Sequence, residues 1–191
     1  MNHLAHLFLA PDSPKARVGS VLGDFTQGVA IDRLPDDVLL GVRHHRRVDA
    51  YTDGHADVLA SKRCFSSARR RFAGIALDVL YDHFLLRHWQ SFSEEDPDSF
   101  IARMYRELEE HEDLMPEPMV RVTRRMVGQD WFGAYQDLDQ IGFALDRISQ
   151  RIRFPNRFSG IIEEIKANEM ELESRFLKFF PELQCVAGDF E

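Results

Sequence analysis

Apolar side chains recur every three or four residues along most of this chain, the spacing that places them on one face of an α-helix. Segments that alternate apolar and polar residues, as strands do, are nearly absent. The clearest stripes are Phe100, Ile101, Met104, Tyr105 and Leu108; Met119, Val122 and Met126; Leu138, Ile141, Leu145, Ile148 and Ile152; and Phe158, Ile161, Ile162, Ile165, Leu172, Phe176 and Phe179. The pattern predicts an all-α fold.

Proline and glycine mark where these helices should begin and end. The second stripe opens after Pro118, where proline suits a first helical turn. The third should stop before Pro155, and the last should end at Pro181. Further breaks are expected at residues 12–14, 53–54, 94–98, 115–118 and 128–130. We find no repeat or interdomain linker, so residues 1–191 are expected to form a single helical domain.

Another helix, over residues 38–53, should carry a histidine and an acidic residue on its buried face. Val38 and Val42 define its apolar stripe, and His45 and Asp49 continue that stripe at helical spacing. A lone inward histidine is usually a hydrogen-bonded core residue. An imidazole and a carboxylate four residues apart, however, can bind one metal ion together.

The ends and the outer face of this helix carry charge. Asp36 or Asp37 is expected to cap its start, and Asp53-Gly54 to end it. Three arginines should spread towards its rim: Arg43, Arg46 and Arg47.

Two carboxylates and a histidine interrupt an apolar run at residues 76–85. Asp78 and Asp82 are four apart and stack on one helical face, and His83 follows about 100° round the axis. Ionised carboxylates in such a run cost several kcal/mol to desolvate unless a positive charge lies opposite. A bound cation is the simplest compensation, and an arginine on a neighbouring helix is the alternative. Asp24, on another expected helix, adds a third segment, so the sequence predicts a metal site in a helical bundle.

Composition and charge limit the possible functions. The chain has 191 residues, 44% of them hydrophobic, which is enough for a sizeable core. A net charge of −8 and a pI near 5.5 argue against general nucleic-acid binding. The two cysteines, Cys64 and Cys185, suggest neither a disulfide framework nor a structural zinc site. With no signal peptide and no transmembrane-length apolar run, we expect a cytoplasmic protein that acts away from membranes.

Several motifs, taken in order, resemble those of bacterial acyl carrier protein phosphodiesterases. They are Met1–Leu7, Gly23–Phe25, His45–Asp49, Thr52–Asp53 and Leu77–Trp89. The resemblance implies a single-domain helical bundle related to the HD-type metal phosphohydrolases. It also implies a manganese- or magnesium-dependent hydrolase that removes the 4′-phosphopantetheine arm from holo acyl carrier protein. The products would be the apo protein and 4′-phosphopantetheine.

The candidate ligands of the ion come from the segments already singled out. They are Asp24, His45, Asp49, Asp82 and His83. Carboxylate and imidazole donors without a thiolate favour Mn²⁺, with Mg²⁺ as the alternative, over structural zinc. Asp78 is either a further ligand or the acceptor that orients one. HD-type enzymes typically carry a His-Asp doublet, whereas the order here is Asp82-His83.

Other polar residues of these motifs are candidates for acting on the phosphodiester. Either Arg46 or Arg47 is expected to clamp a phosphate oxygen, while the other pairs with an acidic side chain or with the partner protein. His88 could protonate the serine leaving group, although packing beside Trp89 is the commoner role for such a histidine. Three further histidines complete the set: His3 and His6, whose roles stay open, and His44, expected at the surface beside His45.

The expected substrate is itself acidic, so net charge offers no long-range attraction. A local arginine face would have to offset the repulsion, and the candidates are Arg69–Arg71 or Arg43 with Arg63. Two alternatives stand beside this interpretation. One is a metal phosphohydrolase acting on a small nucleotide or phosphoester. The other is a non-catalytic helical binding protein whose inward carboxylates pair with arginines.

Overall fold

The computed structural model describes residues 1–154 and 156–189, which form helices and connecting turns with no strand among them. The all-α prediction is therefore confirmed. The helices are α1 (His3–Leu9), α2 (Pro14–Leu22), α3 (Asp36–Gly54), α4 (Ala56–Arg63), α5 (Ala73–Arg87), α6 (Pro97–Glu110), α7 (Glu117–Gly128), α8 (Trp131–Ala134), α9 (Leu138–Ser149), α10 (Ile162–Ala167) and α11 (Glu169–Gly188). Short 3₁₀ turns occupy Gly23–Phe25, Ile31–Arg33, Arg70–Phe72, Trp89–Ser91 and Glu112–Leu114.

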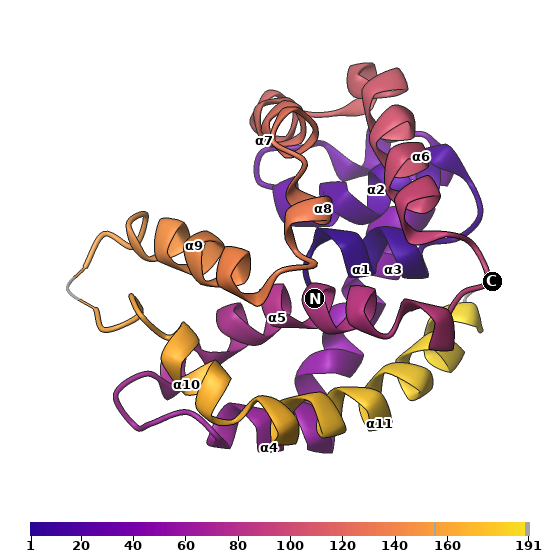
Figure 1. Ribbon diagram of the computed structural model, residues 1–191. Coiled ribbons are helices and arrows are strands. Elements are labelled where there is room, and N and C mark those ends of the chain that lie inside the picture. The colour runs from indigo at the N-terminus through magenta and orange to yellow at the C-terminus, as the bar shows by residue number, and fades with distance from the viewer. Residues whose placement is uncertain (155, 190–191) are drawn as a thin grey trace.

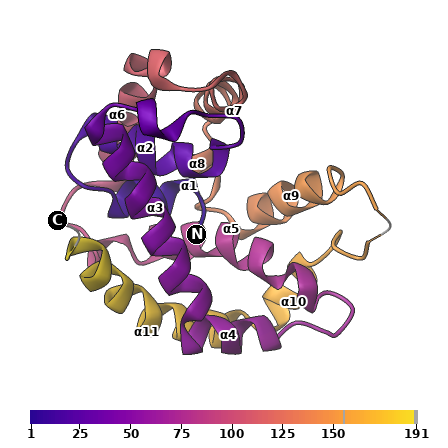
Figure 2. The same cartoon turned by 180° about the vertical axis from the view of Figure 1, so that it is seen from behind.

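The N-terminal helix α1 lies in the middle of the molecule (Figure 1). In this view α2, α6, α7 and α8 lie above it, α4, α10 and α11 lie below it, and α5 crosses between them. From behind, α3 is seen to run from the upper group down to α4 (Figure 2). Helix α9 stands out to one side in both views (Figures 1 and 2).

Helices α2 and α3 approach each other closely because two glycines lie at their contact. A Cβ on Gly19 would lie 2.1 Å from the carbonyl oxygen of Val38, and one on Gly41 would lie 1.9 Å from that of Ala16. Any side chain at either position would clash with rigid backbone. This contact fixes the part of α3 that carries His45 against the end of α2.

Helix α5 is buried over most of its length, as its apolar run predicted. Leu77, Leu80 and Leu85 are almost fully buried. The rings of Tyr81 and Phe84 pack against Phe176 of α11, with centroids 5.3 and 5.7 Å away. The polar residues of α5 are therefore held within the core or at its edge by a rigid helix.

The start of α3 differs from the prediction. The helix begins at Asp36, with Pro35 at the N-cap position and no side-chain cap. Asp36 and Asp37 therefore lie in the first turn, where their charges favour the positive end of the helix dipole.

The predicted C-terminal helix is wrong in two respects. The stripe is divided between α10 and α11 at Asn168, whose side-chain amide donates to the carbonyl of Glu164 over 2.8 Å. Pro181 lies inside α11 instead of ending it. Burial of Leu183 and Ala187 beyond the proline offsets the hydrogen bond that proline removes.

Two other segments depart from the α-helix expected of them. Asp24 lies in the 3₁₀ turn that follows α2. Helix α9 ends at Ser149, so Ile152 lies beyond it, and the stop expected at Pro155 falls outside the described residues. Among the helices of residues 1–154 and 156–189, none is both long and apolar enough to cross a membrane.

Candidate metal centre

Three side chains from two helices converge near the N-terminus. His6 comes from α1, while His45 and Asp49 lie one turn apart on α3, and one ligand atom from each lies within 4.8 Å of the others. His45 Nε2 is 3.1 Å from Asp49 Oδ2, and His6 Nε2 is 3.2 Å from Asp49 Oδ1. The two imidazole rings stack with centroids 3.9 Å apart. Two nitrogens and a carboxylate are thus within reach of one ion.

The end of α2 fixes the orientation of His45. Its Nδ1 lies 2.7 Å from the carbonyl oxygen of Ser20 and donates to it. A Cβ on Gly23 would lie 2.2 Å from Cγ of the ring, so the ring fills the space that a side chain would need. With the Nδ1 proton committed, a neutral ring turns the lone pair of Nε2 towards Asp49. A cation between these facing lone pairs would remove their repulsion, so the donor set fits a metal ion.

Burial keeps His6 neutral. The side chain is fully buried, and burial lowers the pKa of His6 to about 3. Its Nδ1 has no hydrogen-bond partner in the described part of the chain. A neutral imidazole is the form in which histidine binds metal ions. The sequence left the role of His6 open, and the structure adds it to the cluster.

Asp49 is ionised although it is partly buried. Burial raises the pKa of Asp49, but contacts with His45, His6 and the ammonium group of Met1 outweigh burial and hold it well below its usual range. The Met1 nitrogen is 3.0 Å from Asp49 Oδ1. A charged carboxylate beside two imidazoles suits a divalent cation.

Asp78 contacts the same ammonium group from α5. The Met1 nitrogen lies 3.1 Å from Asp78 Oδ1. Burial lowers the pKa of this ammonium, but Asp78 and Asp49 outweigh it and raise the pKa to about 10. Burial also raises the pKa of Asp78 itself. Asp78 and Asp49 therefore share the Met1 ammonium group as a common partner.

Asp24 lies at the solvent side of the cluster. Its Oδ1 is 3.6 Å from His45 Nε2, and its Oδ2 is 3.5 Å from Nδ1 of His3. Its side chain is 44% exposed, so it is accessible to a ligand from outside. Of the five expected ligands, the structure brings Asp24, His45 and Asp49 together.

Asp82, a fourth expected ligand, binds main chain instead. Its carboxylate accepts the N–H groups of Leu4 and Ala5 over 3.2 and 2.9 Å, and the side-chain amide of Asn2 over 2.8 Å. Burial raises the pKa of Asp82 to about 7, although these donors favour the charged form. Asp82 thus caps the start of α1 from α5, and holds the helix that carries His6.

The two histidines predicted on α5 and just after it also have other partners. His83, the fifth expected ligand, holds the carbonyl oxygen of Tyr135 through Nδ1 over 2.8 Å, and burial lowers its pKa. His88 Nε2 lies 2.7 Å from Glu173 of α11. Neither belongs to the cluster of candidate ligands.

Residues beside His45 on α3 divide between surface and core. Arg46 and Arg47 are exposed. His44 was expected at the surface, and this prediction is wrong because the side chain is fully buried. Burial lowers the pKa of His44, and a hydrogen bond with the backbone of Ala187 opposes that change. Helix α11 covers His44 because it continues past Pro181.

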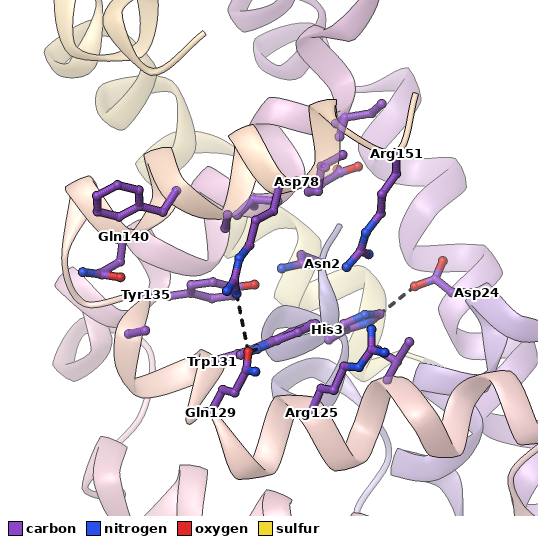
Figure 3. Close-up of a pocket in the computed structure, with 18 of the residues that line it drawn as sticks. Asn2, His3, Asp24, Asp78, Arg125, Gln129, Trp131, Tyr135, Gln140 and Arg151 are labelled. Atoms are coloured by element: carbon purple, nitrogen blue, oxygen red, sulfur yellow. Dashed lines mark hydrogen bonds and ion pairs between the residues drawn. The ribbon is translucent and has the colours of Figure 1, made fainter. Parts of the chain in front are cut away.

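A cleft of about 1070 Å³ opens over this region. Its base includes Met1, His3, Asp24 and Asp78, and residues of α7, α8 and α9 form its walls. Figure 3 shows Asp24 and His3 side by side at one end of the cleft, with Arg125 and Arg151 extending towards them. Asp24 belongs to the cleft and also contacts His45, so the cluster borders the cleft.

Comparison with known proteins decides the family. The family model described as acyl carrier protein phosphodiesterase matches residues 1–183. The chain belongs to the acyl carrier protein phosphodiesterase family. Curated acyl carrier protein phosphodiesterases from Escherichia coli O157:H7 and Shigella boydii serotype 18 are each 31% identical over 189 residues, which is 98% of this chain and 98% of each relative. No solved structure matches the chain significantly.

Membership of the acyl carrier protein phosphodiesterase family confirms the resemblance in the N-terminal motifs. Sequence reasoning missed the place of His6 in the cluster, although His6 interrupts an apolar run just as Asp82 does. Arg125 and Arg151 belong to clusters of arginine that the sequence shows, but sequence reasoning did not assign them to the site, because their segments show no other motif.

Proposed function

We propose that this chain hydrolyses the phosphodiester that joins 4′-phosphopantetheine to a serine of holo acyl carrier protein. The products are apo acyl carrier protein and 4′-phosphopantetheine. The observation that carries the proposal is a cluster of two buried histidines and the half-buried Asp49 bordering a large cleft in a member of this family. The name of the curated relatives supports the choice of substrate.

The proposed cofactor is Mn²⁺, with Mg²⁺ as the alternative. His6, His45 and Asp49 would hold the ion, and Asp24 is positioned to serve as a fourth ligand on the cleft side. Nitrogen and carboxylate donors without a thiolate support this choice. When bound, the ion would supply an activated water and polarise a phosphoryl oxygen.

The chain's own residues hold this arrangement in place. The backbone carbonyl of Ser20 accepts a hydrogen bond from Nδ1–H of His45, which leaves the lone pair of Nε2 for a metal ion. Asp78 acts as a positioning residue, because it shares the Met1 ammonium with Asp49. Asp82 anchors α1 and therefore His6.

The roles first expected of three other residues change in this proposal. His88 Nε2 is engaged by Glu173, so we assign it no proton transfer to the serine leaving group. Arg46 and Arg47 are exposed on α3 and are not among the residues that line the cleft, so we assign them no contact with the phosphate beside the cluster. Both cysteines are free thiols, which supports the cytoplasm as the proposed compartment.

Mass spectrometry tests the activity directly. Holo acyl carrier protein incubated with this protein and Mn²⁺ should lose the mass of phosphopantetheine, and a chelator should prevent the loss. Asp49→Ala should abolish the reaction while the helical circular dichroism signal is kept. Asp37→Ala is the matched control, because Asp37 is an exposed carboxylate in the first turn of the same helix. An intact carrier protein after incubation with wild type and either metal would contradict the proposal.

A further inference from the structure

The walls of the cleft carry positive charge that the protein itself does not neutralise. Arg125 comes from α7, Arg147 from α9, and Arg151 follows the end of α9. Within the described residues, the side chains of Arg125 and Arg151 make no ion pair or hydrogen bond. Arg124, the neighbour of Arg125, instead binds Glu112 through Nε and Nη2 over 2.7 and 2.6 Å. Of the two adjacent arginines Arg124 and Arg125 on α7, the one that faces the cleft is therefore the one without a side-chain partner in the described residues.

The carboxylates of the cleft already have cationic or imidazole partners. Asp78 contacts the Met1 ammonium, and Asp24 contacts His3 and His45. Figure 3 shows Arg125 and Arg151 reaching from opposite walls towards the end of the cleft where His3 lies. Two guanidinium groups that converge without an acidic partner form a site for an anion, and their planar donors match phosphate oxygens.

Apolar side chains line another part of the cleft. Ile75, Val79, Phe143 and Ile148 line it beside Trp131. Phe143 is 64% exposed and Ile75 is 40% exposed, which is unusual for side chains of this size. Exposed apolar groups in a concave site commonly contact the uncharged part of a ligand. The cleft therefore combines an anion site at one end with an apolar surface along its length.

We propose that this cleft binds the 4′-phosphopantetheine arm, with Arg125 and Arg151 holding the phosphate and the apolar residues of α5 and α9 contacting the pantetheine chain. The identity of the arm rests on the proposed function. The phosphate site rests on the placement of the two arginines near Asp24 and His3, at the end of the cleft that borders the candidate metal ligands. Arg147 donates from Nη1 to Oε1 of Gln129 over 3.4 Å, and the same oxygen accepts a hydrogen bond from Trp131 Nε1 over 3.1 Å. Arg147 is therefore a positioning residue, which helps to hold Gln129 and Trp131 in place at the cleft.

Isothermal titration of chelator-treated protein tests this inference without using activity. The probes are 4′-phosphopantetheine, pantetheine and inorganic phosphate. The double variant Arg125→Gln/Arg151→Gln should bind 4′-phosphopantetheine about ten- to a hundred-fold more weakly than wild type, because charge-assisted hydrogen bonds are lost. Its affinity for pantetheine should not change. Phe143→Ser should weaken both pantetheine compounds and leave inorganic phosphate unaffected.

Arg124→Gln is the matched control, since Arg124 is on the same helix and outside the cleft. It should bind all three probes as wild type does. Equal affinity of wild type and the double variant for 4′-phosphopantetheine, or an equal loss in Arg124→Gln, would overturn the inference. Arginine-dependent binding in a protein that leaves holo acyl carrier protein intact would support the phosphate site and reject the proposed function. Cleavage of holo acyl carrier protein, together with binding of 4′-phosphopantetheine that does not depend on these arginines, would keep the proposed function and reject this cleft as the site of the arm.

Discussion

Helices α3 and α5 both place an acidic residue and a histidine in the interior, and they use them differently. On α3, His45 and Asp49 meet His6 from α1, and no backbone group occupies the His45 nitrogen that faces the carboxylate. On α5, Asp82 and His83 are each bound by main-chain groups of other segments. The first pair places its donor atoms beside one another and beside His6, whereas Asp82 of the second pair uses both carboxylate oxygens to hold the start of α1.

The difference teaches that inward polarity is not sufficient evidence for a site. A buried carboxylate needs hydrogen-bond donors or a cation, and either satisfies it. Asp82 finds its donors at the start of α1, where a helix leaves N–H groups without partners inside the helix. Asp49 finds the Met1 ammonium group, which stabilises its charge, and two imidazole nitrogens that together with its carboxylate surround a point where an ion could bind.

The largest effect on stability is expected at Asp82. Asp82→Ala leaves three N–H donors of the α1 start without their acceptor, and the free energy of unfolding should fall by about 3 kcal/mol. Asp49→Ala should lower it much less, because the Met1 ammonium keeps Asp78 as its partner. Urea unfolding of the two variants measures the contrast. Equal losses of unfolding free energy in the two variants would show that Asp82 contributes no more to stability than Asp49 does.

Gly23→Ala should have a smaller effect than Asp82→Ala, and that effect should be a loss of metal affinity. The new Cβ would lie 2.2 Å from the ring of His45 and would push that ring from its place. Displacing a ligand's support typically weakens metal binding about ten- to a hundred-fold. Gly54→Ala is the control, because a Cβ there meets nothing within 4 Å at the end of the same helix. Mn²⁺ titration compares them, and equal affinities would reject the role of Gly23.

The pH dependence of stability gives a further test of the structural role of Asp82. Burial raises the pKa of Asp82 in the folded protein to about 7, from an ordinary value of 3.8. Between these values the folded chain binds more protons at this site than the unfolded chain does. The contribution of Asp82 to stability should therefore decline as pH rises from 4 to 7, by at most about 1.4 kcal/mol per pH unit.

A pair of urea unfolding series isolates this contribution from other titrating groups. The measured quantity is the difference in unfolding free energy between wild type and Asp82→Ala at each pH. A difference that stays constant across this range would show that the pKa of Asp82 is close to its ordinary value.

The fold and part of the candidate site were predictable from periodicity alone. A helix at α3 followed from its apolar stripe and a buried helix at α5 from its apolar run, and the stripe of α3 also placed His45 and Asp49 side by side. Periodicity describes one helix at a time, so it could not show which backbone groups lie opposite an inward side chain. The donors that occupy Asp82 are 77 and 78 residues away in sequence.

Other features escaped prediction because tertiary contacts decide them. Pro181 is a local signal to end a helix, but burial of the residues beyond it continues α11. The residues four positions before and after His6 are Asn2 and Ala10. The sequence therefore shows no second histidine or carboxylate four residues away with which His6 could form a pair of metal ligands. Arg125 and Arg151 come together only when α7 and the end of α9 face each other across the cleft.

The binding of Mn²⁺ by wild type, His45→Ala and His83→Ala tests the central claim most directly. Both histidines are buried and both donate Nδ1–H to a backbone carbonyl, so the two variants are closely matched. Electron paramagnetic resonance of the unbound ion reports the amount bound at equilibrium. We predict that His45→Ala abolishes binding and that His83→Ala keeps the wild-type stoichiometry and affinity. Binding that survives in His45→Ala, or disappears in His83→Ala, would contradict a metal centre at the cluster of α1 and α3.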